Sequence, residues 1–289
     1  MMTLTNLSLA NKGADIFVPD GVSIEEALKR TTHLAVGAHH DDLEIAAYPA
    51  IEHCFENCAA WFAGVVVTDG RGSSRTGPYE KCSDEEIRQI RRREQIRAAM
   101  LGDYGIVIQL DYRSSEIKGG INGSLISDLK QIVEAVEASE VISHQPLDRH
   151  PTHIAVFYHL LKAMRSLPAN RRPDSFLGAE VWGKLDWLSS TQKMTLNSGR
   201  REHLAQALIG VFDSQIAGGK RYDLGEIGHR HANATFGDSH SIDEFTQASL
   251  ALDLSDLLND PSASACEFAL DAVDRFRGET KQRLIDWER

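Results

Sequence analysis

The stretch Leu34-Ala35-Val36-Gly37-Ala38-His39-His40-Asp41-Asp42 joins a short apolar run to a group of chemically active polar residues. Residues 34–38 are typical of a strand buried on both faces of a parallel sheet. From Leu43 to His53 the apolar residues recur at helical spacing, which predicts a helix. A buried strand that passes through a polar turn into a helix is the first unit of an alternating α/β fold.

The same alternation continues along the chain. Further strands are predicted at residues 61–67, 105–110 and 141–144, and segments with a helical pattern follow at residues 84–101, 125–138 and 154–164. Ser83 is a candidate N-cap for the second helix, with acidic residues behind it. Four strands alternating with helices predict a doubly wound, mostly parallel, Rossmann-like sheet, with strand order 3-2-1-4-5.

The C-terminal part of the chain is less regular. Residues 179–182 are predicted as a fifth strand, and residues 201–212 and 265–287 as helices. Residues 216–242 are rich in Gly, His and Asn, which favours an ordered loop, a lid over one end of the sheet. We expect a single α/β domain over residues 1–289, with its core at about 31–185 and the C-terminal loop and helices at 186–289.

The composition restricts the class of partner. The chain has 289 residues, 42% of them hydrophobic, and a net charge of -11. An acidic protein repels phosphate backbones, so neither nucleic acid nor an anionic membrane is an expected partner. A small-molecule substrate is expected instead, and the sequence leaves a homo-oligomer open.

Targeting signals and the cysteine content indicate the cellular compartment. Residues 1–5 lack the basic run and apolar core of a secretory signal, and no apolar stretch approaches the roughly 20 residues needed to span a bilayer. Cys54 and Cys58 lie one helical turn apart, but no second cysteine pair with metal spacing accompanies them. We therefore expect reduced thiols and a cytoplasmic protein.

Two polar segments follow the ends of predicted strands one and four. The first is residues 37–44 and the second is His144-Gln145-Pro146-Leu147-Asp148-Arg149-His150-Pro151-Thr152-His153. In a sheet of order 3-2-1-4-5 these two strands are neighbours at the switch point, where open parallel sheets bind ligands. Residues far apart in the sequence are therefore expected to meet in one crevice.

The residue types in these segments suit a metal site. His39 and Asp42 lie three apart at a strand-to-helix turn, and His153 begins the next helix. Two imidazoles and one carboxylate are typical zinc ligands and leave a coordination position for water. The sequence thus predicts a Zn²⁺ site at which the bound water is activated.

Neighbouring side chains suit proton transfer. Asp41, beside a predicted ligand, is placed to act as general base. His150 could donate a hydrogen bond to an oxyanion, and Asp148 could orient that imidazole or raise its pKa. Taken singly, the two aspartates could be an N-cap and the two histidines could be surface residues near a proline turn. Their joint placement at adjacent strand ends favours the catalytic interpretation.

At these residues the sequence resembles the PIG-L/LmbE-type N-deacetylase family. The family pattern of a histidine, a variable residue, two aspartates and a nearby glutamate appears at residues 39–44, and its second histidine motif at residues 148–153. The resemblance covers roughly residues 31–165. The helix between the two motifs matches the family at Arg91, Glu94, Ala98, Ala99, Leu101 and Gly102.

The resemblance implies the same roles: His39, Asp42 and His153 as zinc ligands, Asp41 as general base and His150 as electrophilic or acid partner. It also implies hydrolysis of an N-acyl, chiefly N-acetyl, group from an amino-sugar-containing substrate, with Zn²⁺ or another divalent metal such as Fe²⁺. The alternatives are a zinc amidase that acts on a non-sugar substrate and a non-catalytic zinc- or saccharide-binding module.

Some positions depart from the family pattern. His40 replaces the commoner proline and is an unused neighbour or an extra pocket donor, and Arg71 stands where many relatives carry Glu. Arg71 and Arg75 could hold a carboxylate or phosphate of the substrate, or be solvated loop charges. His231 and His240, in the Gly-, His- and Asn-rich segment, could reach the substrate from a lid, hold a second metal, or be structural.

Overall fold

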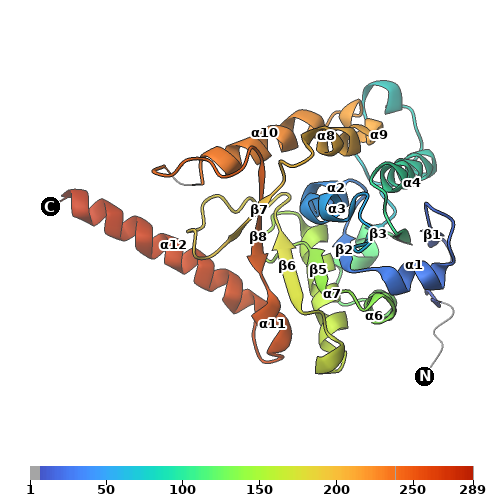
Figure 1. Cartoon of the computed structure of the whole chain (residues 1–289), viewed down its shortest axis with the longest axis horizontal. Coiled ribbons are helices and arrows are strands. Elements are labelled where there is room, and N and C mark those ends of the chain that lie inside the picture. The colour runs from blue at the N-terminus through green and yellow to red at the C-terminus, as the bar shows by residue number, and fades with distance from the viewer. Residues whose placement is uncertain (1–6, 238, 289) are drawn as a thin grey trace.

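A mixed eight-stranded sheet forms the centre of the molecule in the computed structural model, which describes residues 7–237 and 239–288. Residues 1–6, to which the prediction about a secretory signal refers, lie outside the described part. The strands lie in the order β1-β4-β3-β2-β5-β6-β8-β7 (Figure 1). Their bounds are β1 Asp15–Phe17, β2 His33–Gly37, β3 Phe62–Thr68, β4 Ile106–Tyr112, β5 Glu140–Ser143, β6 Ser175–Ala179, β7 Met194–Asn197 and β8 Ala248–Asp253.

The predicted strand order is confirmed for the central part of the sheet. Strands β4, β3, β2, β5 and β6 are parallel neighbours and correspond to the expected order 3-2-1-4-5. The edges, which the sequence did not indicate, are antiparallel: β1 pairs with β4, while β8 pairs with β6 and β7. The carboxyl ends of β2 and β5 are therefore adjacent, as expected at a switch point.

Helices cover both faces of this sheet. Their bounds are α1 Ile24–Arg30, α2 Asp42–Ala46, α3 Tyr48–Cys54, α4 Asp84–Leu101, α5 Ser114–Lys118, α6 Gly123–Val136, α7 Pro151–Arg165, α8 Glu202–Gly210, α9 Asp213–Ile216, α10 Tyr222–Thr235, α11 Ser255–Asn259 and α12 Ala265–Glu288. Residues 77–79 and 169–171 form single 3-10 turns.

Alternate side chains of the central strands enter two separate hydrophobic cores. In β2, Leu34 and Val36 pack into the core that contains α1, α6 and α7, whereas Ala35 packs into the core that contains α2, α3, α4 and α8. This alternation follows from the period of two along a strand. Both faces of the central strands are therefore buried, which explains why these strands read as continuous apolar runs.

Three predicted elements differ from the structure. The single helix expected over residues 43–53 is two helices, α2 and α3. Pro49 lies in the first turn of α3, where a proline is tolerated, whereas in the interior of one continuous helix it would remove a backbone hydrogen bond. The fifth strand, predicted at residues 179–182, ends at Ala179. Residues 216–242, expected to be a loop, contain the 14-residue helix α10.

Helix α10 lacks an apolar stripe of the usual kind. Its buried positions are the polar residues Glu226, Arg230 and Asn233, which recur at helical spacing. Arg230 donates to Glu226 (3.2 Å) and to the Glu44 carbonyl oxygen (2.8 Å). Hydrophobic periodicity cannot detect a helix whose inward face is polar.

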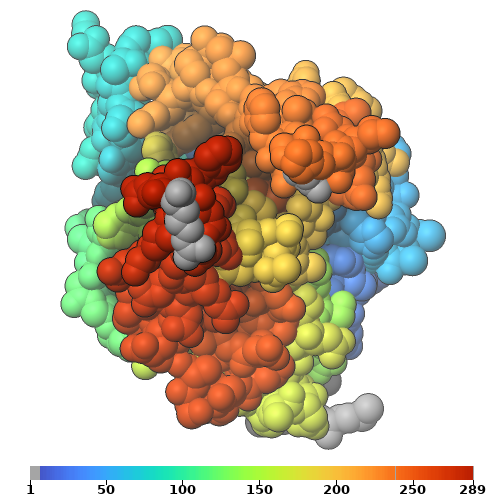
Figure 2. Space-filling model, turned by 90° about the vertical axis from the view of Figure 1, so that its left-hand side faces the viewer, coloured from blue at the N-terminus to red at the C-terminus, as the bar shows by residue number. Residues whose placement is uncertain are grey.

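The C-terminal helix α12 lies at the outside of the molecule. In Figure 1 it extends away from the sheet, and Figure 2 shows it (red) on one face, apart from α10 (orange). Of the helices among residues 7–237 and 239–288, none is both long and apolar enough to span a membrane.

Candidate active site

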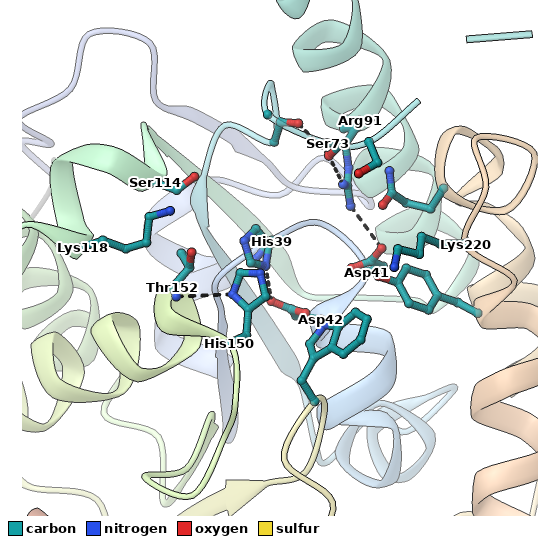
Figure 3. A pocket seen from close by; sticks show the side chains of 16 residues that line it. His39, Asp41, Asp42, Ser73, Arg91, Ser114, Lys118, His150, Thr152 and Lys220 are labelled. Atoms are coloured by element: carbon teal, nitrogen blue, oxygen red, sulfur yellow. Dashed lines mark hydrogen bonds and ion pairs between the residues drawn. The ribbon is translucent and has the colours of Figure 1, made fainter. Parts of the chain in front are cut away.

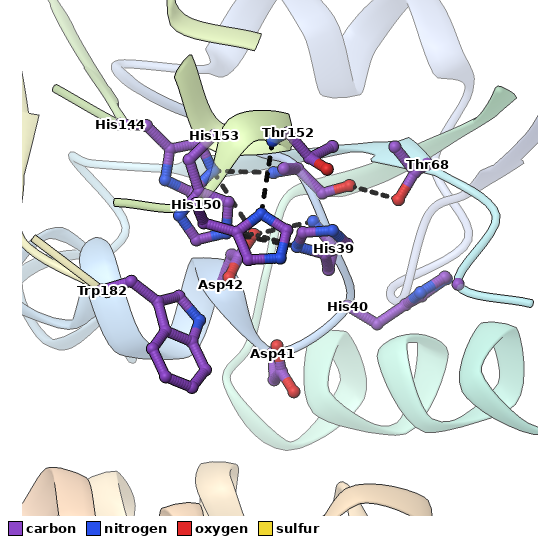
Figure 4. A network of polar contacts seen from close by, with 12 residues as sticks. His39, His40, Asp41, Asp42, Thr68, His144, His150, Thr152, His153 and Trp182 are labelled. Carbon is purple, nitrogen blue, oxygen red and sulfur yellow. Dashed lines mark hydrogen bonds and ion pairs between the residues drawn. The ribbon is translucent and has the colours of Figure 1, made fainter. Parts of the chain in front are cut away.

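The two predicted polar segments meet at the carboxyl ends of β2 and β5. The first forms the turn from β2 into α2, and the second leads from β5 into α7, with His150 as the N-cap of α7. The structure brings His39, Asp42 and His153 together, with Asp41 and His150 beside them (Figures 3 and 4). His39, Asp41, Asp42 and His150 line a pocket of about 390 Å³, and the fully buried His153 lies behind this lining.

Three ligand-type atoms form a compact triangle. His39 Nδ1 lies 3.2 Å from Asp42 Oδ2 and 3.2 Å from His153 Nε2, and the last two atoms are 3.4 Å apart. In a tetrahedral zinc site with bonds of about 2.0–2.1 Å, neighbouring ligand atoms are about 3.3–3.4 Å apart. The triangle therefore has the dimensions that a small divalent cation requires.

Asp148 fixes the orientation of His153. Its Oδ2 lies 3.1 Å from His153 Nδ1, and because an ionised carboxylate only accepts, Nδ1 donates and Nε2 keeps its lone pair for a cation. Asp148 also accepts from the backbone N–H groups of His150 (2.7 Å) and Trp182 (3.2 Å). The prediction that Asp148 orients the His150 imidazole is corrected, since the ring that it holds is that of His153.

The neighbouring charged groups shift the pKa values of Asp42 and His153 in opposite directions. Burial acts to raise the pKa of Asp42, but the surrounding imidazoles of His153, His144 and His39 lower it well below its usual range. Burial likewise acts to lower the pKa of His153, but Asp42 and Asp148 raise it. An ionised Asp42 among imidazole nitrogens is a site that favours positive charge.

Asp41 is held in an unusual backbone conformation. Its φ of 86° lies in the left-handed region, which costs a non-glycine residue roughly 1–3 kcal/mol and occurs mostly at functional sites. Arg91, buried in α4, donates to Asp41 Oδ2 (3.1 Å) and to the backbone oxygen of His40. Burial raises the pKa of Asp41 to about 8, although Arg91 acts in the opposite direction.

His150 has a defined tautomer when neutral. Its Nδ1 accepts a hydrogen bond from the backbone N–H of Thr152 (3.3 Å), so the ring proton lies on Nε2. Burial, reinforced by His39 and His153, lowers the pKa of His150 to about 4. The neutral ring can therefore donate one hydrogen bond from Nε2.

Other predicted contacts lie outside the pocket lining. Arg71 pairs with Asp69, and Arg75 donates to Asp84 (2.6 Å) and to three backbone oxygens. Both arginines therefore stabilise the loop that carries them. The cationic side chains that line the pocket are instead those of Arg91, Lys118 and Lys220.

The remaining histidines also lie elsewhere. His231 contacts Thr246 and Gln247, and His240 lies on the exposed segment after α10. His40 turns away from the cluster (Figure 4) and is buried against Gln109 (3.0 Å). None of these three side chains lines the pocket.

Several residues of the site, in or behind the pocket lining, were not identified from the sequence. His144 is fully buried, stacks on His153 with ring centroids 3.8 Å apart, and accepts from the Ala38 N–H (2.9 Å). Because that N–H occupies its Nε2 lone pair, His144 supports the cluster from behind. Trp182 follows the end of β6, and its position after a parallel strand was a usable signal. No sequence pattern indicated Tyr222 or Gln215, which line the pocket from the C-terminal helices.

Comparisons with known proteins agree with this arrangement. The family model described as GlcNAc-PI de-N-acetylase (PIG-L) matches residues 34–164, which include both polar segments. The uncharacterized deacetylase YaiS of Escherichia coli (strain K12) is 28% identical over 158 residues, 52% of this chain and 77% of that protein.

Solved structures share the fold. The N,N'-diacetylchitobiose deacetylase of Pyrococcus horikoshii aligns with a TM-score of 0.62 at 17% identity, over 80% of this chain and 86% of that one. The 4-carboxy-2-hydroxymuconate hydratase GalB of Pseudomonas putida KT2440 aligns with a TM-score of 0.61 at 16% identity, over 81% and 98% of the two chains. One fold thus carries two different reactions, so the reaction has to be argued from the site.

Proposed function

Since the chain belongs to the PIG-L/LmbE-type deacetylase family, we propose that it is a metal-dependent hydrolase that removes an N-acyl group from an amino-sugar-containing substrate. The observation that carries this proposal is the triangle of His39 Nδ1, Asp42 Oδ2 and His153 Nε2, with edges of 3.2–3.4 Å, beside the buried carboxyl group of Asp41.

The donor set fits a divalent cation. His39, Asp42 and His153 would hold it, and Asp148 behind His153 supplies the carboxylate that commonly orients a metal-binding imidazole. Zinc suits two imidazoles and one carboxylate, although another divalent ion such as Fe²⁺ would use the same donors. A bound ion would polarise the amide carbonyl and lower the pKa of water to about 7.

Asp41 is the proposed general base. Its carboxyl group borders the pocket, and burial raises its pKa, which makes it a stronger proton acceptor than an exposed carboxylate. Asp41 takes a proton from the water that attacks the carbonyl carbon. It then gives this proton to the amine nitrogen as the C–N bond breaks, so that the amine and the carboxylic acid leave, and the acid passes its proton to the amine or to water.

His150 is the proposed oxyanion donor. Its Nδ1 accepts from Thr152, so its Nε2–H is the atom that can donate to the negative oxygen formed when water adds to the carbonyl group. Because this hydrogen bond strengthens as the charge develops, it lowers the barrier more than it tightens substrate binding.

The pocket lining supports a polyhydroxylated substrate. Hydroxyl and amide groups from four separate segments face it, and the exposed Trp182 ring forms one wall. Sugars present both hydroxyl groups and apolar ring faces, which such a lining can match. The polar side chains concerned are Ser73, Ser74, Ser114, Thr152 and Gln215.

An assay of amine release tests the proposal. The zinc-loaded protein is given N-acetylglucosamine, N,N'-diacetylchitobiose and a set of N-acetyl amino acids, and free amine and acetate are measured. Release from the sugars is expected. Release of amine from the N-acetyl amino acids alone would indicate that the substrate is a non-sugar amide. Tight binding of the sugars without release of amine would indicate a non-catalytic binding module.

Asp41→Asn separates catalysis from metal binding. The variant is expected to keep stoichiometric zinc and to lose most turnover, since the amide cannot accept a proton. Asp128→Asn is the matched control, because Asp128 is equally buried but accepts from Tyr112 and Ala10 on the opposite face of the sheet. Near-normal turnover of Asp41→Asn would remove Asp41 from this role.

A further inference from the structure

A second, smaller chamber opens beside the catalytic cluster. It has a volume of about 200 Å³ and shares Asp41, Asp42, Trp182 and Tyr222 with the main pocket. The aromatic rings of Trp182 and Tyr222 meet edge to face, with centroids 6.4 Å apart, and border both spaces. The two carboxylates that the proposed chemistry uses therefore lie at the junction of two chambers.

The two chambers differ in polarity. Beyond the shared residues, the main pocket is lined mostly by hydroxyl, amide and cationic groups. The small chamber is lined by Ile45, Val181 and Gly225, and by Lys184 and Glu226, whose charges are paired at 3.5 Å. Its lining thus offers mainly apolar contacts.

Gly225 lines this chamber. It lies inside helix α10, where glycine is less favourable than alanine, and a Cβ at this position would meet no atom within 4 Å. The same helix carries Gly228 one turn further on, also with open space around it, but Gly228 does not line the chamber.

An amide places two different groups on either side of its carbonyl carbon. When the carbonyl carbon lies at the junction of the two chambers, one side of the amide can enter each of them. The polyhydroxylated amine portion suits the large polar pocket, and the acyl chain suits the small apolar chamber. We propose that the chamber beside Trp182 and Gly225 binds the acyl chain, and that the enzyme prefers apolar acyl groups longer than acetyl. This inference rests on the proposed function.

The volume of the small chamber limits the length of the acyl chain that it can hold. An apolar cavity of about 150 Å³ in another protein admits benzene, so a chamber of about 200 Å³ accommodates an acyl group of about four to six carbons. Each methylene transferred from water to such a surface contributes about a threefold to fourfold gain in transition-state binding.

A chain-length series tests the inference. The zinc-loaded protein is given N-acetyl-, N-butyryl- and N-hexanoylglucosamine, and kcat/KM is measured from amine release. It is expected to rise about tenfold from acetyl to butyryl, which differ by two methylenes. Release from the acetyl compound with equal or lower values for the longer chains overturns the inference and leaves the proposed function standing. No release from any of the three contradicts the proposed function itself.

Two glycine variants link the preference to the chamber. Gly225→Leu fills the space and is expected to lower the butyryl-to-acetyl ratio of kcat/KM at least fivefold. Gly228→Leu makes the same change on the same helix outside the chamber and is expected to keep the ratio within twofold of wild type. Equal ratios in both variants would overturn the assignment, and matching thermal midpoints show that both are folded.

Discussion

Asp148→Asn provides the sharpest test of how the metal site is held. The Asp148 carboxylate accepts from His153 Nδ1 at 3.1 Å and from two backbone N–H groups, those of His150 and Trp182. Asparagine has the same shape but has one acceptor oxygen and no charge, so it cannot accept from all three donors. His153 then loses the charged partner that makes its Nε2 a strong ligand.

The magnitude follows from that contact. A hydrogen bond to a charged group contributes about 1.5–3 kcal/mol and a neutral one about 1 kcal/mol, so the charge contributes about 0.5–2 kcal/mol. This corresponds to a twofold to thirtyfold change in affinity, which overlaps the tenfold to hundredfold loss typical of such partners. We expect zinc to bind about tenfold more weakly to Asp148→Asn.

Competition with a chromophoric chelator measures this affinity. Asp128→Asn serves again as control, since it removes a buried carboxylate that accepts from Tyr112 (2.7 Å) without touching the cluster. It is expected to lower the thermal midpoint while zinc affinity stays unchanged. A folded Asp148→Asn with a zinc Kd within twofold of wild type would refute the reasoning.

Three further predictions concern stability and reactivity. Zinc at one hundred times its Kd should stabilise the fold by about 2.7 kcal/mol, whereas His39→Ala should show no such gain in a thermal melt; equal shifts in both proteins would contradict the ligand assignment. Arg91→Ala leaves the buried Asp41 carboxyl group without its hydrogen-bond donor and should cost about 1–3 kcal/mol in urea unfolding, so a loss below about 0.5 kcal/mol would show that the pair is not needed. Burial raises the pKa of the Cys54 thiol to about 12, while Cys58 is exposed; iodoacetamide at pH 8 should therefore label Cys58 first, and peptide mass spectrometry showing equal rates would exclude this difference.

Much of the central fold could be predicted because its signals are local. The apolar run at residues 34–38 and the capped helix over residues 84–101 each depend on neighbouring residues alone. The Ser83 capping box is present as expected, and α4 has the predicted bounds. The strand order was taken from the doubly wound fold class, which the alternation of strands and helices indicates without reference to side-chain detail.

The proximity of His39, Asp42 and His153 was also predictable, because it follows from strand order and not from side-chain detail. The partner of Asp148 was not predictable. Asp148 lies two residues from His150 and five from His153, and only the path of the chain into α7 turns its carboxylate toward the more distant ring.

The sequence by itself determined the alternating sheet, the two polar segments and their meeting at one edge, since each depends on short-range pattern and on the strand order typical of doubly wound folds. Tertiary structure alone decided what surrounds that edge. Helix α10 is held by buried polar contacts such as that of Arg230 with Glu44, which is far from it in sequence. Because such contacts leave no periodic apolar signal, neither the wall formed by Tyr222 and Gly225 nor the chamber behind it could be read from the chain.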